Sequence, residues 1–175
     1  MRKNLILLLW LPFIHATAWI QIPELVNLDF LIGQWSGTGS GFGNNESTIE
    51  SSFEYVMEGN YIEVYFESVF EPTTTNPDGD HHIDKGFISY DHAGRQVDFR
   101  QFNSEGYVNR YVLVDSLSTP TTLVFETKEI ENFVPGGRAR WTIKRSGEDQ
   151  IETVFDVSFG EKGYTCLGTN MLTRK

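Results

Sequence analysis

The chain is dominated by short segments in which apolar and polar residues alternate, a period-2 pattern that predicts β-strands. Turn signals such as Glu58-Gly59-Asn60 and Pro135-Gly136-Gly137 separate the segments, and no long amphipathic helix is evident. Consecutive strands joined by short turns predict an up-and-down meander, and closing it removes the exposed edges. The predicted fold is an all-β, ten-stranded up-and-down antiparallel β-barrel. Its expected strands are Gln34–Phe42, Ser47–Met57, Tyr61–Glu71, Lys85–Asp91, Gln96–Asn103, Tyr107–Asp115, Thr122–Ile130, Ala139–Arg145, Gln150–Phe159 and Thr165–Arg174.

Residues 1–18 have the pattern of a cleaved signal peptide. Arg2 and Lys3 are followed by an apolar run and then by Ala16-Thr17-Ala18, an A-x-A cleavage pattern. The apolar run is too short to span a bilayer, which needs about 20 residues. We therefore expect an exported protein, periplasmic or secreted, with no stable membrane insertion after cleavage. The barrel domain would then cover residues 19–175.

Charge and cysteine content limit the partners of the mature protein. The formal net charge of the chain is −10, and loss of Arg2 and Lys3 with the signal peptide would move it to −12. Such a surface repels phosphate backbones and anionic lipid, so nucleic-acid binding is not expected. The only cysteine is Cys166, which excludes a disulfide within the chain.

A ten-stranded barrel is wider than an eight-stranded one, whose interior side chains can already fill, so a cavity is expected. Alternation places Gln101 and Arg110 on otherwise apolar strand faces. A buried arginine needs a partner, which a ligand carboxylate or carbonyl, or a structural ion pair, could supply. The opposite face of that strand, with Asn109 and Tyr111, could equally point inward. The residues expected to line a ligand site are Trp35, Tyr55, Gln101, Arg110 and Trp141.

The start of the barrel carries a distinctive motif. Glu24 to Leu31 predict one or two helical turns, and the run Leu31-Ile32-Gly33-Gln34-Trp35-Ser36-Gly37-Thr38-Gly39-Ser40-Gly41 follows. The glycines share the face of Trp35, so a ligand, a loop or a coiled neighbouring strand should approach closely there. Topology places Arg174, on the last strand, beside Trp35, where a cation–π contact would close the barrel. Gly33, Trp35 and Arg174 are the residues expected to form this closure.

This motif resembles the first strand of calycin barrels, the lipocalins and fatty-acid-binding proteins, and most closely that of nitrobindin-like haem-binding barrels. His81-His82-Ile83-Asp84-Lys85-Gly86-Phe87-Ile88 and the terminal Leu172-Thr173-Arg174 are similar to further segments of that family. The resemblance implies haem as a possible cofactor, held by a histidine seven residues before the closing arginine. That position is Leu167 here, or Cys166 if a one-residue bulge intervenes, and neither is a histidine.

The remaining motifs indicate no specific chemistry. Asp78, Asp80, His81, His82 and Asp84 crowd one segment, but their spacing fits no defined metal site and indicates a solvated turn. No Gly-x-Ser-x-Gly elbow or phosphate loop is present. The sequence therefore favours a protein that binds a small apolar or amphipathic ligand, whose identity it does not specify; nor does it specify the oligomeric state. The alternatives are a haem protein with a replaced ligand and a barrel enzyme, an isomerase or hydratase, which would need a perturbed acid pointing inward.

Overall fold

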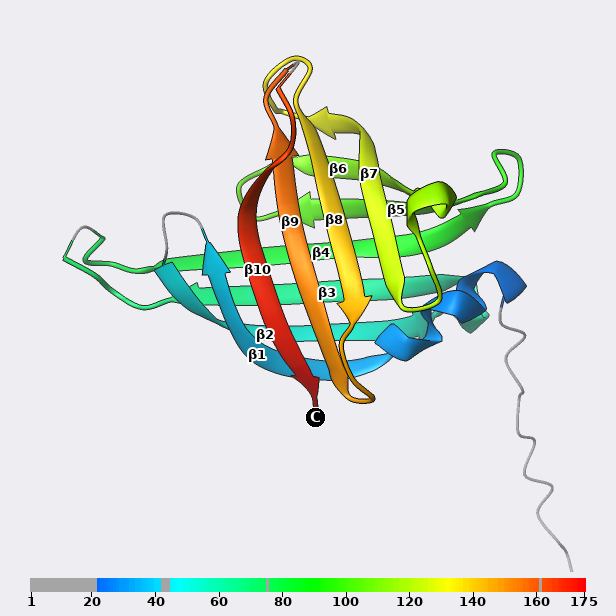
Figure 1. Ribbon diagram of the computed structural model, residues 1–175, viewed down its shortest axis with the longest axis horizontal. Helices are drawn as coiled ribbons and strands as arrows, with labels where there is room; N and C mark the ends of the chain where they lie inside the picture. Colours follow the sequence, from blue (N-terminus) through cyan, green and yellow to red (C-terminus); the bar gives the residue numbers. More distant parts are fainter. Residues whose placement is uncertain (1–21, 42–44, 75, 161) are drawn as a thin grey trace, which may run out of the picture.

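A computed structural model of the chain describes residues 22–41, 45–74, 76–160 and 162–175. It confirms the predicted fold, a closed antiparallel barrel in which each strand pairs with its neighbours in sequence and β1 pairs with β10 (Figure 1). The expected signal peptide, residues 1–18, lies outside the described residues. None of the helices in the described part of the chain has the length and hydrophobicity needed to cross a bilayer. The strands are β1 (Gly33–Gly41), β2 (Asn45–Val56), β3 (Tyr61–Phe70), β4 (Asp80–Asp91), β5 (Gln96–Asn103), β6 (Val108–Leu113), β7 (Thr122–Glu131), β8 (Arg138–Arg145), β9 (Gln150–Ser158) and β10 (Thr165–Arg174).

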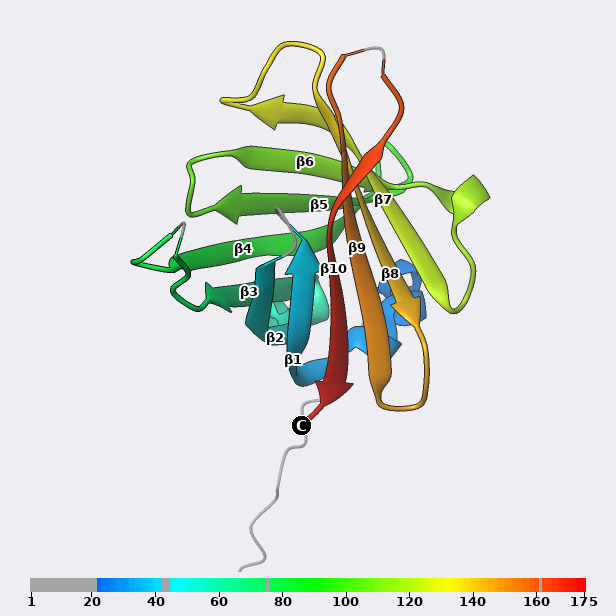
Figure 2. The same ribbon diagram turned by 60° about the vertical axis from the view of Figure 1, so that its left-hand side comes forward.

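Three short 3₁₀ segments accompany the strands in the described residues: η1 (Pro23–Leu31), η2 (Met57–Gly59) and η3 (Asp115–Leu117). A 3₁₀ helix has three residues per turn, so Leu25, Leu28 and Leu31 of η1 form one stripe, and all three are fully buried. In both ribbon views η1 lies at the end of the barrel where the chain terminates, and the β7–β8 and β9–β10 connections lie at the opposite end (Figures 1 and 2). The helix thus plugs one end of the barrel.

Closure depends on close approach between the first and last strands, which Figure 2 shows side by side. A Cβ atom added at Gly37 would lie 1.9 Å from the Met171 carbonyl oxygen, and one at Gly41 would lie 2.1 Å from that of Leu167. The glycine spacing predicted close approach by a ligand, a loop or a coiled neighbouring strand. In the described residues, the group that approaches these glycines is the neighbouring strand β10. Glycine is required at these positions because any side chain would push β10 away.

The fourth strand is longer than predicted. It begins at Asp80 instead of Lys85, and its first residues pair with the end of β3, from Phe70 opposite Asp80 to Phe66 opposite Asp84. Residues 80–84 are therefore not the solvated turn that their composition indicated. Because side chains of a strand alternate, His82 and Asp84 share the inner face with Gly86 and Ile88.

Candidate functional site

The unplugged end of the barrel contains a cavity of about 310 Å³. Its floor is Trp141, whose ring lies among the rings of Phe53, Phe66 and Phe99, with centroids 5.3–6.4 Å apart. This aromatic cluster fills the middle of the barrel and separates the cavity from the plugged end.

The cavity has one predominantly apolar wall. It is formed by side chains of β3 and of β7 to β10, with aromatic side chains at the mouth. Tyr107 and Phe133 pack edge to face there, with ring centroids 5.5 Å apart. Such a wall can bury the apolar body of a small molecule. Its members are Phe66, Phe70, Ile130, Phe133, Ala139, Trp141, Phe155, Val157, Phe159 and Leu167.

The facing wall, on β4 to β6, is polar. Asn103 Nδ2 donates a short hydrogen bond to the Asp84 carboxylate. Asn109 Nδ2 donates to Gln101 Oε1 at 3.0 Å and lies 3.4 Å from Asn103 Oδ1. Tyr111, next to these amides, is buried and its ring stacks on Phe99. The cavity is therefore amphipathic. Its ionisable groups lie on this wall, while the uncharged polar side chains of Ser40, Ser47, Ser68, Thr153 and Asn170 line it on other strands.

Two titratable groups of this wall are perturbed. Burial raises the pKa of Asp84 to about 6; the hydrogen bond from Asn103 opposes this shift, the charge of Glu105 adds to it and His82 opposes it. Burial also raises the pKa of Tyr111, and the nearby Asp84 charge adds to the effect.

His82 stands at the cavity rim between two carboxylates. Nδ1 forms a short hydrogen bond with Glu105, and Nε2 lies 3.0 Å from Asp80 Oδ2. Burial lowers the pKa of His82, but the hydrogen bonds and charges of Glu105 and Asp80 outweigh it, so the pKa is raised overall. Among the described residues, no group of three or more His, Cys, Asp or Glu side chains is arranged to hold a metal ion.

The structure brings together two of the five expected ligand-site residues, Gln101 and Trp141, in the cavity. Trp35 and Tyr55 lie at the plugged end. The Tyr55 hydroxyl donates to Asp29 Oδ1 at 2.6 Å and lies 3.3 Å from the Leu25 carbonyl oxygen, so it ties β2 to η1.

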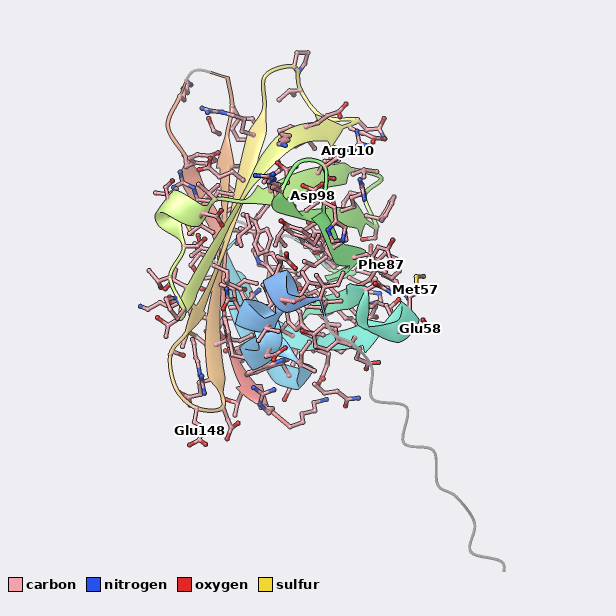
Figure 3. All side chains as sticks on the ribbon, turned by 90° about the vertical axis from the view of Figure 1, so that its right-hand side faces the viewer. Met57, Glu58, Phe87, Asp98, Arg110 and Glu148 are labelled. Atoms are coloured by element: carbon pink, nitrogen blue, oxygen red, sulfur yellow. The ribbon has the colours of Figure 1, made fainter. Side chains whose placement is uncertain are left out.

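The inward orientation expected of Arg110 is wrong. Arg110 is on the outer surface, where Nη1 donates to Glu129 Oε2 at 2.9 Å across the β6–β7 pair (Figure 3). The other face of β6 points inward, with Asn109 and Tyr111 buried. A guanidinium inside the barrel would need a buried counter-charge, whereas outside it has Glu129 and water.

The expected closure residues meet at the plugged end. The Arg174 guanidinium carbon lies 4.2 Å from the centroid of the Trp35 ring, and Trp35 Nε1 donates to the Leu31 carbonyl oxygen at 2.7 Å. Arg174 also donates to the carbonyl oxygens of Phe30 and Ile32. Gly33 leaves room for this arginine, because a Cβ atom there would lie 2.8 Å from Arg174 Nη1.

Neither position that the family resemblance implied for a haem ligand fits that role. Leu167 lines the cavity, but its side chain has no donor atom. The pairing of β10 with β9 does shift register between Cys166 and Gly168, yet Cys166 is exposed and is not part of the lining. The residues present therefore do not form the implied iron site.

The sequence did not predict Asp84 as a cavity residue, because the expected strand began at Lys85, one residue after it. The signal was available: extending the alternation backwards from Gly86 puts Asp84 on the same face. Asn109 and Tyr111 belonged to the face of β6 that the pattern left open, and their inward orientation was decided by packing against Gln101 and Phe99.

No protein-family model matches this chain, and no curated protein does. A crystal structure of Rv2717c from M. tuberculosis is similar, with a TM-score of 0.64, 17% identity, and coverage of 89% of this chain and 99% of that one. This likeness shows a shared barrel fold. A structure of EF1p2_mFAP2b bound to DFHBI has a TM-score of 0.47 at 14% identity, covering 85% of this chain and 97% of that one. A de novo designed fluorescence-activating β-barrel has a TM-score of 0.40 at 14% identity, covering 84% and 95%.

Proposed function

We propose that this chain is an exported binding protein that holds a small, largely apolar molecule in its barrel. The observation that carries the proposal is the cavity of about 310 Å³, with an aromatic and aliphatic wall facing a few polar groups. Small-molecule sites commonly have this composition, because apolar burial supplies affinity and a few polar groups fix orientation. Export is inferred from the signal-peptide pattern of residues 1–18.

Binding can be tested with a neutral apolar fluorophore such as Nile red and a variant that fills the cavity. Ala139 is buried and lines the cavity, so Ala139→Phe would place an aromatic ring in the space a ligand needs. We expect saturable binding to the wild type and at least about tenfold weaker binding to Ala139→Phe, as loss of apolar contact area dictates.

The matched control is Thr142→Phe, which adds the same ring on the same strand but on the outer face. It should bind the fluorophore as the wild type does. Unfolding midpoints of both variants show whether each is folded. Equal binding to wild type and Ala139→Phe, or no saturable binding to the wild type, would contradict the proposal. Native mass spectrometry of protein purified from its own organism would identify a retained ligand directly.

The proposal does not include haem. The resemblance to nitrobindin-like barrels rests on the first strand and scattered segments, while Leu167 and exposed Cys166 occupy the positions where the ligand histidine is needed.

A second candidate function, a proton-transfer enzyme of isomerase or hydratase type, is favoured by one observation. Asp84 lines the cavity with its pKa raised to about 6, and a general acid or base works best when its pKa is near the working pH. Exchange of α-protons of an apolar ketone in D₂O, followed by NMR, tests this candidate. Faster exchange with the wild type that is lost in Asp84→Asn supports this candidate function. If the wild type does not accelerate the exchange, the candidate function is contradicted.

A further inference from the structure

Tyr111 lines the cavity with a hydroxyl group that has no hydrogen-bond partner among the described residues. The residue is 2% exposed and stacks on Phe99. Among the described residues, Ser51 Oγ is the only fully enclosed side-chain polar atom without a partner, so the Tyr111 hydroxyl keeps contact with the cavity. The contents of the cavity can therefore supply its hydrogen-bond partner.

Next to Tyr111, the Asp84 carboxylate fixes the orientation of the neighbouring amides. An ionised carboxylate only accepts, so Asn103 must turn its Nδ2 toward Asp84, which leaves its Oδ1 facing Asn109. Asn109 Nδ2 therefore donates to both Asn103 and Gln101.

This arrangement leaves acceptors available to a ligand. Asn109 Oδ1 and the second oxygen of Asp84 have no hydrogen-bond partner among the described residues, although Asn109 is only 5% exposed. The amide donors of this group without a partner among the described residues are Gln101 Nε2 and the second N–H of Asn103 Nδ2. The polar wall can therefore accept several hydrogen bonds from one ligand group.

The charge of the polar wall also favours a cationic ligand group. Asp84 and Glu105 line the cavity, and the described lining residues include no lysine or arginine. The one lining group that can become cationic, His82, is already held by Glu105 and Asp80. Arg100 and Arg110 lie on outward-facing positions of β5 and β6. A ligand carboxylate would meet like charges with no counter-charge, whereas a ligand cation would meet a carboxylate.

We propose that the cavity is selective for lipophilic amines: an apolar body on the aromatic wall and an ammonium group bound by Asp84, Tyr111 and Asn109. This inference rests on the proposed binding function and specifies its ligand class. An ammonium group carries three donors and no acceptor, which matches the three unpartnered oxygens. Asp84 supplies the counter-charge that a desolvated ammonium requires.

Three probes of nearly equal size test the selectivity: naphthylethylamine, naphthylethanol and naphthylacetate. Affinities are measured by displacement of a bound neutral fluorophore. For the wild type we expect the amine to bind at least about tenfold more tightly than the carboxylate, because a charged hydrogen bond is exchanged for like-charge repulsion.

Single substitutions test which residues cause the selectivity for the amine. Asp84→Asn keeps an acceptor for Asn103 and should weaken amine binding about tenfold or more, while alcohol binding changes by less than about threefold. Tyr111→Phe should weaken the amine and the alcohol, since both lose a hydrogen bond. Asp98→Asn is the matched control: it removes the same charge on the outer face of β5, where Asp98 accepts from Gln96, and should leave all three affinities unchanged (Figure 3).

The outcomes separate this inference from the function on which it rests. If the alcohol binds but the carboxylate binds as tightly as the amine, or Asp84→Asn weakens all three probes equally, the selectivity for amines is contradicted while the binding function stands. If none of the probes binds saturably to the wild type, the binding function and this inference both fail.

Discussion

At the scale of single residues, the half-buried Arg174 connects more parts of the described structure than its position near the C-terminus suggests. Its guanidinium stacks on Trp35, donates to carbonyl oxygens at the end of η1, and forms an ion pair with Asp149 at 3.1 Å. The planar, five-donor group of arginine can do this, whereas the point charge of lysine cannot satisfy several directions at once.

We expect Arg174→Ala to lower the free energy of unfolding by about 2–4 kcal/mol, the sum of a cation–π contact and two or three hydrogen bonds. Arg174→Lys should recover part of that loss. The control is Lys175→Ala, which removes an exposed ion pair with Glu50 and should cost less than about 1 kcal/mol. Urea unfolding measures all three variants. Equal effects of Arg174→Ala and Lys175→Ala would show that the contacts of Arg174 with Trp35 and η1 do not stabilise the barrel.

The ionisation of Asp84 works against folding. Its folded pKa, about 6, is above its ordinary value of 3.8, so the folded state binds the proton more tightly than the unfolded state. Stability therefore falls as the pH rises from about 4 to 6, and the whole penalty is present above that range.

Asp84→Asn should consequently stabilise the protein at pH 8 and have little effect at pH 4. The difference between these two pKa values of Asp84 sets an upper limit of about 3 kcal/mol on the stabilisation, which water in the cavity will reduce. Unfolding curves of wild type and variant at both pH values measure the difference. A variant that is less stable at pH 8, or a difference that is independent of pH, would contradict the assignment of Asp84 as a buried carboxyl.

At the scale of elements, η1 closes one end of the barrel. The packing of its leucine stripe and the hydrogen bond from Tyr55 to Asp29 hold it in place. The buried leucines of η1 fill that end, and the cavity lies at the other end.

Leu28→Ala should lower the free energy of unfolding by about 2–5 kcal/mol, the range for truncating a fully buried leucine. The control is Val26→Ala, because Val26 lies on the same helix and is 45% exposed. This substitution should change the free energy of unfolding by no more than about 0.5 kcal/mol. Thermal unfolding of both variants gives the comparison. Equal effects would mean that η1 is not packed into the barrel end.

At the scale of the whole molecule, the barrel divides into a packed half and a hollow half. The Trp141 cluster forms the boundary, the plug and Arg174 close the packed half, and the polar wall lies in the hollow half. Stability and ligand recognition are therefore assigned to different ends, so substitutions in the cavity should affect binding with modest effects on folding.

Hemin provides a test at this scale, because it would have to occupy the hollow half. With Leu167 facing the cavity and Cys166 exposed, we expect hemin titration to give no saturable Soret shift. Leu167→His restores the residue type at the position implied by the family resemblance and serves as the comparison. A saturable shift with the wild type would show that another side chain ligates the iron.

The sequence by itself determined the barrel. Period-2 alternation and turn residues act locally, so ten strands and their order could be predicted, and the glycines of β1 with Trp35 and Arg174 marked where the first and last strands meet. Gln101 and Trp141 were also placed correctly inside, because each lies within an unbroken alternating segment.

Only the tertiary structure decided which face of β6 points inward and where β4 begins. Arg110 and Asn109 are adjacent in sequence, and either face of that strand carries both apolar and polar groups, so local pattern could not choose between them. The choice depended on partners distant in sequence: Glu129 outside for Arg110, and Gln101 and Asn103 inside for Asn109. The candidate ligand site exists because strand pairing brings Asp84, Asn109 and Tyr111 to one wall, and such proximity follows from register and closure, which no single segment specifies.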